Sequence, residues 1–217
     1  MDFEQHNIYH IYNQGNNKQK IFFIKENYYF FIGKIKTHVL QFADILAWCL
    51  MPNHFHIMVY VNYPELIAGV TDNCSETHPM TSSHRMSAPL SLNNSIAILL
   101  RSYTRAINKQ ENRTGSLFKP HTKAECLTNS SGITPAFFNT KNGTMINRPI
   151  NAKEYPQICF NYIHNNPVKA WLVDAPDEWE FSSFREFFGG EILVNKTRVN
   201  QLGLHHLSGI DSLNPIN

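Results

Sequence analysis

The chain has 217 residues, of which 42% are hydrophobic, and this is enough for one sizeable core. A net charge of +2 is too small to indicate a nucleic-acid partner by itself, and 4 cysteines without a CxxC pair argue against a zinc ribbon or a disulfide framework. The sequence shows neither a secretory signal pattern nor an apolar run of about 18 residues, so we expect a cytoplasmic protein with no membrane partner.

The first third of the chain alternates strand and helix patterns. Residues 7–17 predict a strand that ends in a Gly-Asn turn, and one face of this strand carries Ile8, His10 and Tyr12. Apolar residues at three- and four-residue steps predict a helix over 25–42. Residues 43–62 predict one long strand, or two strands that meet at Pro52, because proline cannot donate a hydrogen bond to a sheet.

Two further helices and a strand are predicted in the second half. Residues 92–112 have the pattern of an amphipathic helix, and residues 114–127 predict a strand after a glycine turn. Residues 154–173 predict a helix of about three turns. Pro156 suits the first turn of this helix, and we expect Pro167 to end it.

Two segments lack a periodic apolar pattern. Residues 71–91 and 128–152 are polar and contain prolines, so we expect irregular insertions in a single domain that spans residues 1–190. The weak periodicity of residues 191–217 predicts a partly ordered tail. The succession of strand, helix, strands, helix, strand and helix predicts an α+β sandwich, in which helices pack on one sheet.

Two histidines stand one residue apart in the apolar run CLMPNHFHIMVY, residues 49–60. Side chains alternate faces along a strand, so His54 and His56 share one face while Phe55 lies on the other. Two imidazoles about 7 Å apart on a strand can converge on one metal ion, but a third ligand must then come from another element. The alternative, two hydrogen-bonded histidines on a half-buried strand, stays open.

The run NYIHNNPVK, residues 161–169, offers the missing groups. Tyr162 and Asn166 are four residues apart and therefore lie on one face of a helix, whereas His164 points away from that face. A tyrosine hydroxyl is a nucleophile when it is positioned and activated, and an amide oxygen is a hard metal ligand. The alternative is that Tyr162 packs against Ile158 and that Asn166 caps the helix before the proline.

The helix over 92–112 carries a second tyrosine and several cations. Tyr103 lies in an apolar stripe with leucines and isoleucines, so we expect it in the core. Five basic residues are candidates for tracking a DNA backbone: Arg101, Arg105, Lys109, Lys119 and Lys123. The alternative is an ordinary solvated helix face.

Five stretches together resemble a known family. They are YHIYNQGNN, AWCLMPNHFHIMVY, RTGSLF, YIHNNPVKAWLV and EWEFSSFREF, and they span residues 7 to about 188 in this order. The chain resembles the single-tyrosine HUH transposases, whose name describes two histidines around a bulky hydrophobic residue, and in particular the REP-associated tyrosine transposases. This resemblance implies a ferredoxin-like α+β sandwich, an antiparallel sheet with packed helices.

The resemblance also implies a site and a reaction. It implies that His54, His56 and Asn166 hold a divalent cation, Mg²⁺ or Mn²⁺, and that Tyr162 is the nucleophile. The expected activity is cleavage and rejoining of single-stranded or hairpin DNA through a 5′-phosphotyrosine link. The insertions at 71–91 and 128–152 depart from the compact members of the family, which leaves the details of the substrate open.

Two other functions stay open at this point. One is a regulator that binds DNA hairpins and has weak or lost nuclease activity. The other is a metal-dependent phosphodiesterase that uses water as its nucleophile and forms no link between protein and DNA. The protein is expected to be a monomer or a homodimer.

Overall fold

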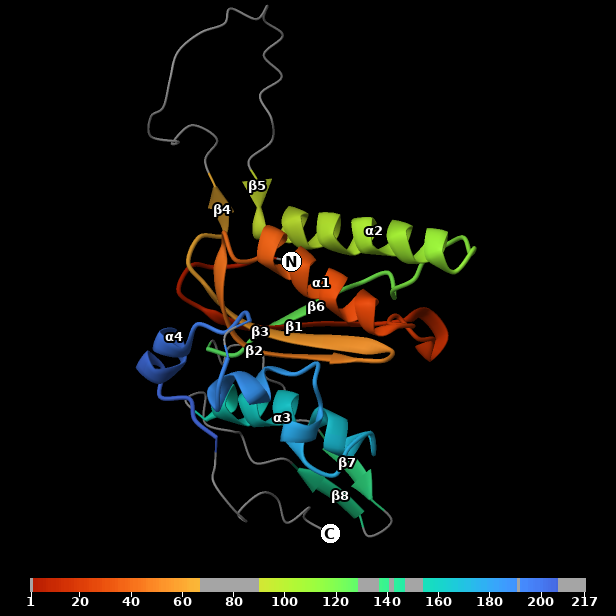
Figure 1. The fold of residues 1–217 in the computed structure, drawn as a ribbon. Helices are drawn as coiled ribbons and strands as arrows, with labels where there is room; N and C mark the ends of the chain where they lie inside the picture. Colours follow the sequence, from red (N-terminus) through yellow and green to blue (C-terminus); the bar gives the residue numbers. More distant parts are fainter. Residues whose placement is uncertain are drawn as a thin grey trace, which may run out of the picture.

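The computed structural model describes residues 2–66, 90–128, 137–140, 143–146, 154–190 and 192–206, with the backbone alone for the short strands between 137 and 146. The main body contains β1 (Ile8–Gln14), α1 (Lys25–His38), β2 (Ala43–Met51), β3 (His54–Val61), α2 (Leu92–Gln110) and β6 (Lys123–Cys126). The four strands form an antiparallel sheet in the order β2-β3-β1-β6, and α1 and α2 lie together over one face of it (Figure 1). This β-α-β-β-α-β succession is ferredoxin-like, so the predicted fold class is confirmed.

The break at Pro52 separates two strands. The hairpin of β2 and β3 pairs Met51 with His54, and the carbonyl of Pro52 accepts a hydrogen bond of 2.8 Å from the amide of Ile21. Of the two alternatives for residues 43–62, two strands is therefore correct. The hairpin also places His54 directly after the turn, at the start of β3.

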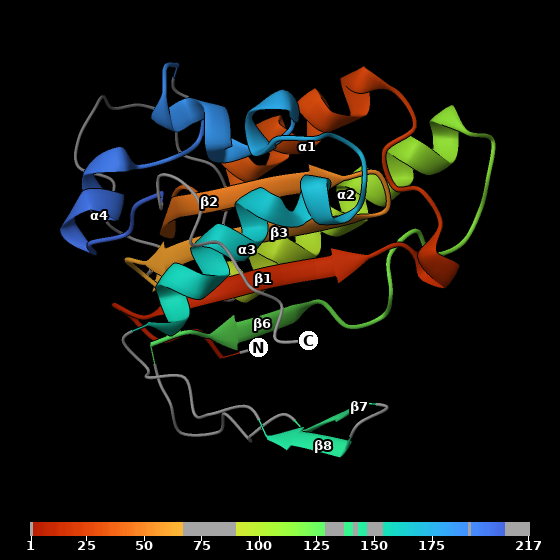
Figure 2. The same ribbon diagram turned by 90° about the horizontal axis from the view of Figure 1, so that it is seen from below.

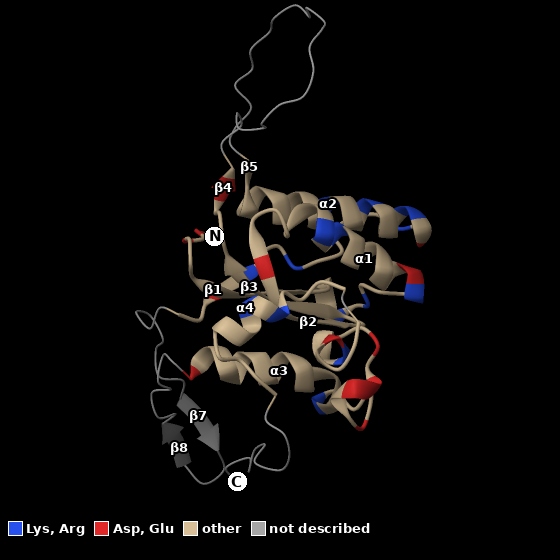
Figure 3. Ribbon diagram, turned by 60° about the vertical axis from the view of Figure 1, so that its left-hand side comes forward, with Lys and Arg blue, Asp and Glu red and all other residues tan. Residues whose placement is uncertain are grey.

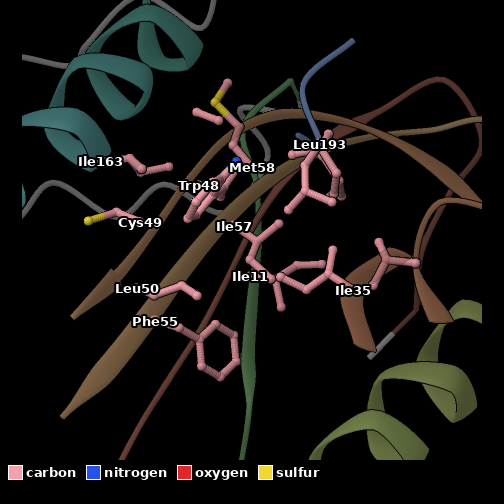
Figure 4. Packing of buried hydrophobic residues seen from close by; sticks show 14 of the residues in the cluster. Ile11, Ile35, Trp48, Cys49, Leu50, Phe55, Ile57, Met58, Ile163 and Leu193 are labelled. Carbon is pink, nitrogen blue, oxygen red and sulfur yellow. The ribbon is translucent and has the colours of Figure 1, made fainter. Parts of the chain in front are cut away.

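The main core lies between the sheet and the pair α1 and α2. Alternation along β3 turns Phe55 and Ile57 toward these helices, and both belong to one buried cluster with Ile11 of β1 and Ile35 of α1 (Figure 4). Each fully buried side chain of this kind contributes about 1.5–3 kcal/mol to stability. The same alternation leaves the even-numbered residues of β3 for the opposite face of the sheet.

That opposite face is covered by α3 (Tyr155–Lys169), which lies across the strands (Figure 2). Pro156 stands in the first turn, as predicted. Our prediction that Pro167 ends the helix is wrong, since α3 continues to Lys169 and Ala170 donates to the carbonyl of Asn166 at 3.0 Å. A proline this close to the end removes only one helical hydrogen bond, the bond from its own nitrogen, so the last turn still forms.

The C-terminal part closes the outer edge of β2. It contains η2 (Pro176–Glu178), η3 (Ser183–Phe187) and α4 (Lys196–Gln201). Leu50 donates to the carbonyl of Phe181 at 2.8 Å, and the buried carboxylate of Glu186 accepts from the indole of Trp48 at 2.6 Å. The predicted tail also packs against the domain, since the amide of Asn195 donates to the carbonyl of Ile45 at 2.9 Å, and residues 207–217 lie outside the described part.

The two predicted insertions are described only in part. Residues 71–89 lie outside the described residues, and Leu90–Ser91 forms β5, which pairs with β4 (Glu65–Leu66). Within 128–152, where we expected no regular structure, β7 (Phe137–Thr140) and β8 (Gly143–Ile146) form a two-stranded hairpin. A short hairpin needs only a local turn, and the sequence Lys141-Asn142-Gly143 favours one.

No helix in the described part of the chain is long and apolar enough to cross a membrane.

His206 joins the C-terminal segment to the domain by its ring. The centroid of the imidazole lies 4.5 Å from that of Phe184, 4.7 Å from that of Phe187 and 5.0 Å from that of Phe160. Its buried Nε2 has no hydrogen-bond partner among the described residues. Burial, and secondarily the neighbouring His205, lower the pKa of His206 to about 4.

Replacing His206 by phenylalanine should therefore make folding less sensitive to acid. The unfolded imidazole binds a proton below about pH 6.5 while the folded one stays neutral to about pH 4. The wild-type stability from this group is complete above the unfolded pKa and is lost as the pH falls through this window. Between pH 7 and pH 5, the free energy of unfolding should fall by on the order of 1 kcal/mol less in the variant than in wild type, as measured by chemical unfolding. The effect is no larger because partial contact with solvent screens it.

The matched control for this experiment is His205→Gln. His205 is adjacent in sequence but exposed, and it contributes only the smaller part of the shift at His206, so its replacement should change the pH dependence of unfolding much less than His206→Phe does. An equal change in both variants would contradict the role of the buried ring.

Candidate metal and nucleophile site

The two histidines of β3 and Asn166 of α3 meet between the sheet and the helix. Nε2 of His54 lies 3.4 Å from Oδ1 of Asn166, and Nε2 of His56 lies 3.0 Å from Nδ2 of the same amide. The two imidazole centroids are 5.0 Å apart, with the rings nearly perpendicular. Both histidines thus direct the same type of nitrogen at one amide group, which is the convergence that a shared ion requires.

The other nitrogen of each imidazole has its own partner. Nδ1 of His54 lies 2.6 Å from Oδ1 of Asn53, and Nδ1 of His56 lies 2.9 Å from Nε2 of His10 on β1. The Asn53 oxygen can only accept, so Nδ1 of His54 carries the proton and Nε2 keeps its lone pair. If Nδ1 of His56 donates to His10 in the same way, both Nε2 atoms are free to bind a cation.

Burial keeps these imidazoles neutral. It lowers the pKa of His56 to about 2, with a smaller effect of His10 and His54, and it lowers the pKa of His10 to about 4. Burial also lowers the pKa of His54, against the opposing effect of the Asn166 oxygen, which stabilises the protonated ring. Neutral imidazole is the form that binds a metal, so this pocket favours the required protonation state at neutral pH.

The donor set fits a divalent cation with three protein ligands. In the part of the chain that the structure describes, no three His, Cys, Asp or Glu side chains are placed to share an ion. A cation here therefore depends on the amide oxygen of Asn166 as its third ligand. Two imidazoles and one amide oxygen suit Mn²⁺, while Mg²⁺ prefers oxygen and would retain several waters.

Tyr162 stands beside this group. Its ring centroid lies 5.5 Å from that of His56 and 6.3 Å from that of His10, edge to face in both cases. The side chain is 39% exposed, so a strand in solvent can reach it. Nζ of Lys169, two turns further along α3, lies 5.3 Å from the Tyr162 ring centroid. The site therefore combines a reachable phenol, a cation and the two imidazoles.

Tyr103 is in the core, as predicted. It is fully buried, its hydroxyl donates to the carbonyl of Ile21 at 2.8 Å, and burial raises its pKa above the usual value. It belongs to α2, on the opposite side of the sheet from Tyr162 (Figure 1). This tyrosine has no access to a phosphate.

The predicted backbone-binding cations are divided between the two faces of the sheet, and Lys123 lies beside the site, since the ring of its neighbour Tyr12 has its centroid 5.8 Å from that of His56. Arg101, Arg105 and Lys109 are exposed on α2. Because α2 and α3 lie on opposite sides of the sheet, the sheet separates these cations from α3 (Figure 3). Lys119 is exposed in the connection to β6. Lys123 pairs across the strands with Tyr12, and its Nζ lies 5.9 Å from the Tyr12 ring centroid. A strand bound at both α2 and Tyr162 would have to pass around the sheet.

Sequence reasoning missed three residues of the site: His10, Asn53 and Lys169. His10 was placed on the correct face of its strand, but its neighbour across the sheet could not be identified before the pairing of β1 with β3 was known. Asn53 directly precedes His54, and an Asn before a metal-binding His is a local signal that could have been used. The spacing of seven residues between Tyr162 and Lys169 was also available, because two turns of helix bring such residues to one face.

His164 was left out of the site, and the structure places it elsewhere. It is fully buried, and its Nε2 lies 2.7 Å from the hydroxyl of Ser183.

No protein-family model and no curated protein matches the sequence. Among solved structures, the fold is similar to that of a REP-associated tyrosine transposase bound to a REP hairpin, with a TM-score of 0.51 and 15% sequence identity. The similarity covers 96% of this chain and 88% of that one. It therefore extends beyond the sheet and its two first helices to α3 and the C-terminal part. The described part of the chain therefore has a fold similar to that of a tyrosine transposase.

Proposed function

We propose that the protein is a metal-dependent transposase or endonuclease that cleaves and rejoins single-stranded DNA through a 5′-phosphotyrosine intermediate. One observation carries this proposal: Nε2 atoms of His54 and His56 converge on Asn166 while the exposed ring of Tyr162 lies against His56. The similar fold of a tyrosine transposase supports the same reading.

The residues have separate tasks in this reaction. Oη of Tyr162 attacks the scissile phosphorus and loses its proton to solvent, the bond from phosphorus to the 3′-oxygen breaks, and the 3′-oxygen takes up a proton from solvent. The products are a 5′-phosphotyrosine and a free 3′-hydroxyl, and attack by another 3′-hydroxyl reverses the step. His54, His56 and Asn166 would hold a divalent cation, which would supply positive charge against the phosphate oxygens. Lys169 adds a positive charge beside the ring.

The proposed substrate is an imperfect DNA hairpin with a flanking single strand. The structurally similar transposase was bound to a REP hairpin. The exposed position of Tyr162 agrees with an unpaired strand, whose phosphates can enter a narrow site.

The test is incubation of the purified protein with labelled hairpin DNA and Mn²⁺ or Mg²⁺, followed by denaturing gel electrophoresis. We expect a protein–DNA band that survives denaturation and disappears with a chelator. Cleavage without such a band would indicate a water nucleophile and a phosphodiesterase. Binding without cleavage would indicate a hairpin-binding regulator.

The contact between His10 and His56 gives a prediction about metal affinity. His10→Phe keeps an aromatic ring at this buried position but removes the partner of Nδ1 of His56. Loss of such an outer partner typically costs 10- to 100-fold in metal affinity, and we expect Mn²⁺ binding, measured by calorimetry, to weaken by about this factor.

The control is His10→Gln, whose side-chain amide reaches about as far as Nε2 of histidine. It should bind Mn²⁺ more tightly than His10→Phe if the role of His10 is to orient His56. Wild-type Mn²⁺ affinity in the folded phenylalanine variant would show that His56 is oriented without His10.

A further inference from the structure

Trp171 occupies an unusual backbone position directly after α3. Its amide donates to the carbonyl of Val168 at 2.9 Å, and the amide of Leu172 donates to the carbonyl of Pro167 at 3.0 Å. These two bonds form the Schellman motif that ends a helix, and Trp171 is its left-handed residue, with φ of 57°. Glycine is the usual residue here, because any side chain is strained at positive φ.

The side chain of Trp171 contributes little to the fold. It is 93% exposed, and its ring makes no aromatic or cation contact with the described residues. In contrast, Trp48 is fully buried and the indole of Trp179 donates to the carbonyl of Leu50. Backbone strain and the exposure of a large apolar ring both disfavour tryptophan at this position. We therefore expect that the indole contacts another molecule.

The location indicates which molecule. Trp171 follows the helix that carries Tyr162 and Asn166, about 13 Å beyond Tyr162 along the helix axis at 1.5 Å per residue. Lys169 lies between them, with its Nζ 5.3 Å from the Tyr162 ring. Trp171 thus stands two residues after Lys169, at the end of the helix that carries Tyr162, and a strand of a few nucleotides with one phosphate at Tyr162 is long enough to cover this distance.

The charges around Trp171 favour contact with a base over contact with a phosphate. Asp174, Asp177 and Glu178 follow within the next seven residues, and only Glu178 among them is held, by the amides of Asp174 and Ala175. Carboxylates repel phosphates, but they do not oppose stacking of an uncharged ring on an indole.

We propose that Trp171 is a stacking platform for an unpaired nucleobase of the DNA strand on which Tyr162 acts. This inference rests on the proposed function, because it takes single-stranded DNA as the substrate. Stacking on an aromatic side chain is available to every base, so the platform would position the strand without reading its sequence.

The test compares Trp171→Gly with Trp171→Phe and Trp171→Leu in the Tyr162→Phe background, where the strand is bound but not attacked. Glycine relieves the strain, so the glycine variant should unfold at the same or a higher temperature. Its dissociation constant for a fluorescent single-stranded oligonucleotide should rise roughly tenfold or more, as for loss of one stacked base. The phenylalanine variant should retain most of the affinity for the oligonucleotide. The leucine variant should lose it, because leucine is apolar but cannot stack on a base.

Two further measurements locate the base. Binding of the oligonucleotide should quench tryptophan fluorescence in the Tyr162→Phe protein but not when Trp171 is also replaced by glycine. Oligonucleotides with one abasic site at successive positions should include one for which the effect of Trp171→Gly disappears. Unchanged affinity and unchanged quenching in the glycine variant would overturn the proposal, and equal affinity of the leucine and phenylalanine variants would replace stacking by general apolar contact.

Failure of this inference can be distinguished from failure of the proposed function. If protein with Tyr162 intact forms the covalent adduct and Trp171→Gly forms it with the same DNA affinity, the stacking platform is wrong and the function stands. If the strand stacks on Trp171 but no adduct forms with either metal, the function is wrong and the platform stands as a DNA-binding feature.

Discussion

Tyr162→Phe should eliminate the covalent protein–DNA adduct while the protein remains folded and binds DNA. The substitution removes one oxygen and keeps the ring that packs against His56 and His10. The hydroxyl makes no hydrogen bond to a described residue, so its loss should not change the melting temperature measurably. The readout is the denaturant-resistant band on a gel, together with DNA affinity measured by anisotropy.

Tyr103→Phe is the matched control for this experiment. It removes the same atom from a buried tyrosine and breaks the hydrogen bond to Ile21, which should cost about 1 kcal/mol of stability. The adduct should form as in wild type, because Tyr103 lies in the core of the other layer. An adduct that survives in Tyr162→Phe and disappears in Tyr103→Phe would reverse the assignment of the nucleophile.

His54→Ala and His56→Ala should each reduce the rate of cleavage by roughly 10²-fold or more, since each removes a ligand of the ion that offsets phosphate charge. His54 is partly exposed, so its replacement should leave the fold intact, whereas His56 is 5% exposed and its removal should also lower stability. Asn166→Ala should be milder, with cleavage that recovers in part at high metal concentration. Cleavage rates and Mn²⁺ affinity should be measured together at neutral pH.

His206→Phe provides the control for removal of a histidine as such. It lies among phenylalanine rings away from the proposed ligands, so it should cleave at the wild-type rate and bind Mn²⁺ with wild-type affinity. If His54→Ala also cleaves at the wild-type rate with either metal, the proposed ligand set is wrong.

Local periodicity was sufficient to predict much of the fold. It was also sufficient to predict which candidate site residues share a face of the same strand or helix. The alternation of a strand placed His54 and His56 on one face, and the helical repeat placed Tyr162 with Asn166 and buried Tyr103. These inferences depend only on neighbours along the chain. For the same reason the helix and strand order was enough to predict the α+β sandwich.

What could not be predicted depends on contacts between distant parts of the chain. The pairing of β1 with β3 brings His10 to His56, and no local pattern in either strand contains that register. The layer on which a helix packs is equally non-local, so the sequence alone could not show that the sheet lies between the cations of α2 and Tyr162 of α3. The end of α3 was misjudged for a different reason, because the effect of Pro167 depends on its distance from the end of the helix.

The order of the site along the chain has a consequence during protein synthesis. The ribosome completes β1 and β3, with all the imidazoles of the site, about a hundred residues before it reaches Tyr162 and Asn166. A nascent or truncated chain that stops before α3 therefore contains the histidines but neither the proposed nucleophile nor the proposed amide ligand. If Tyr162 is the nucleophile, such a fragment cannot join itself to DNA, and the covalent reaction starts only when the last helix of the site has been made.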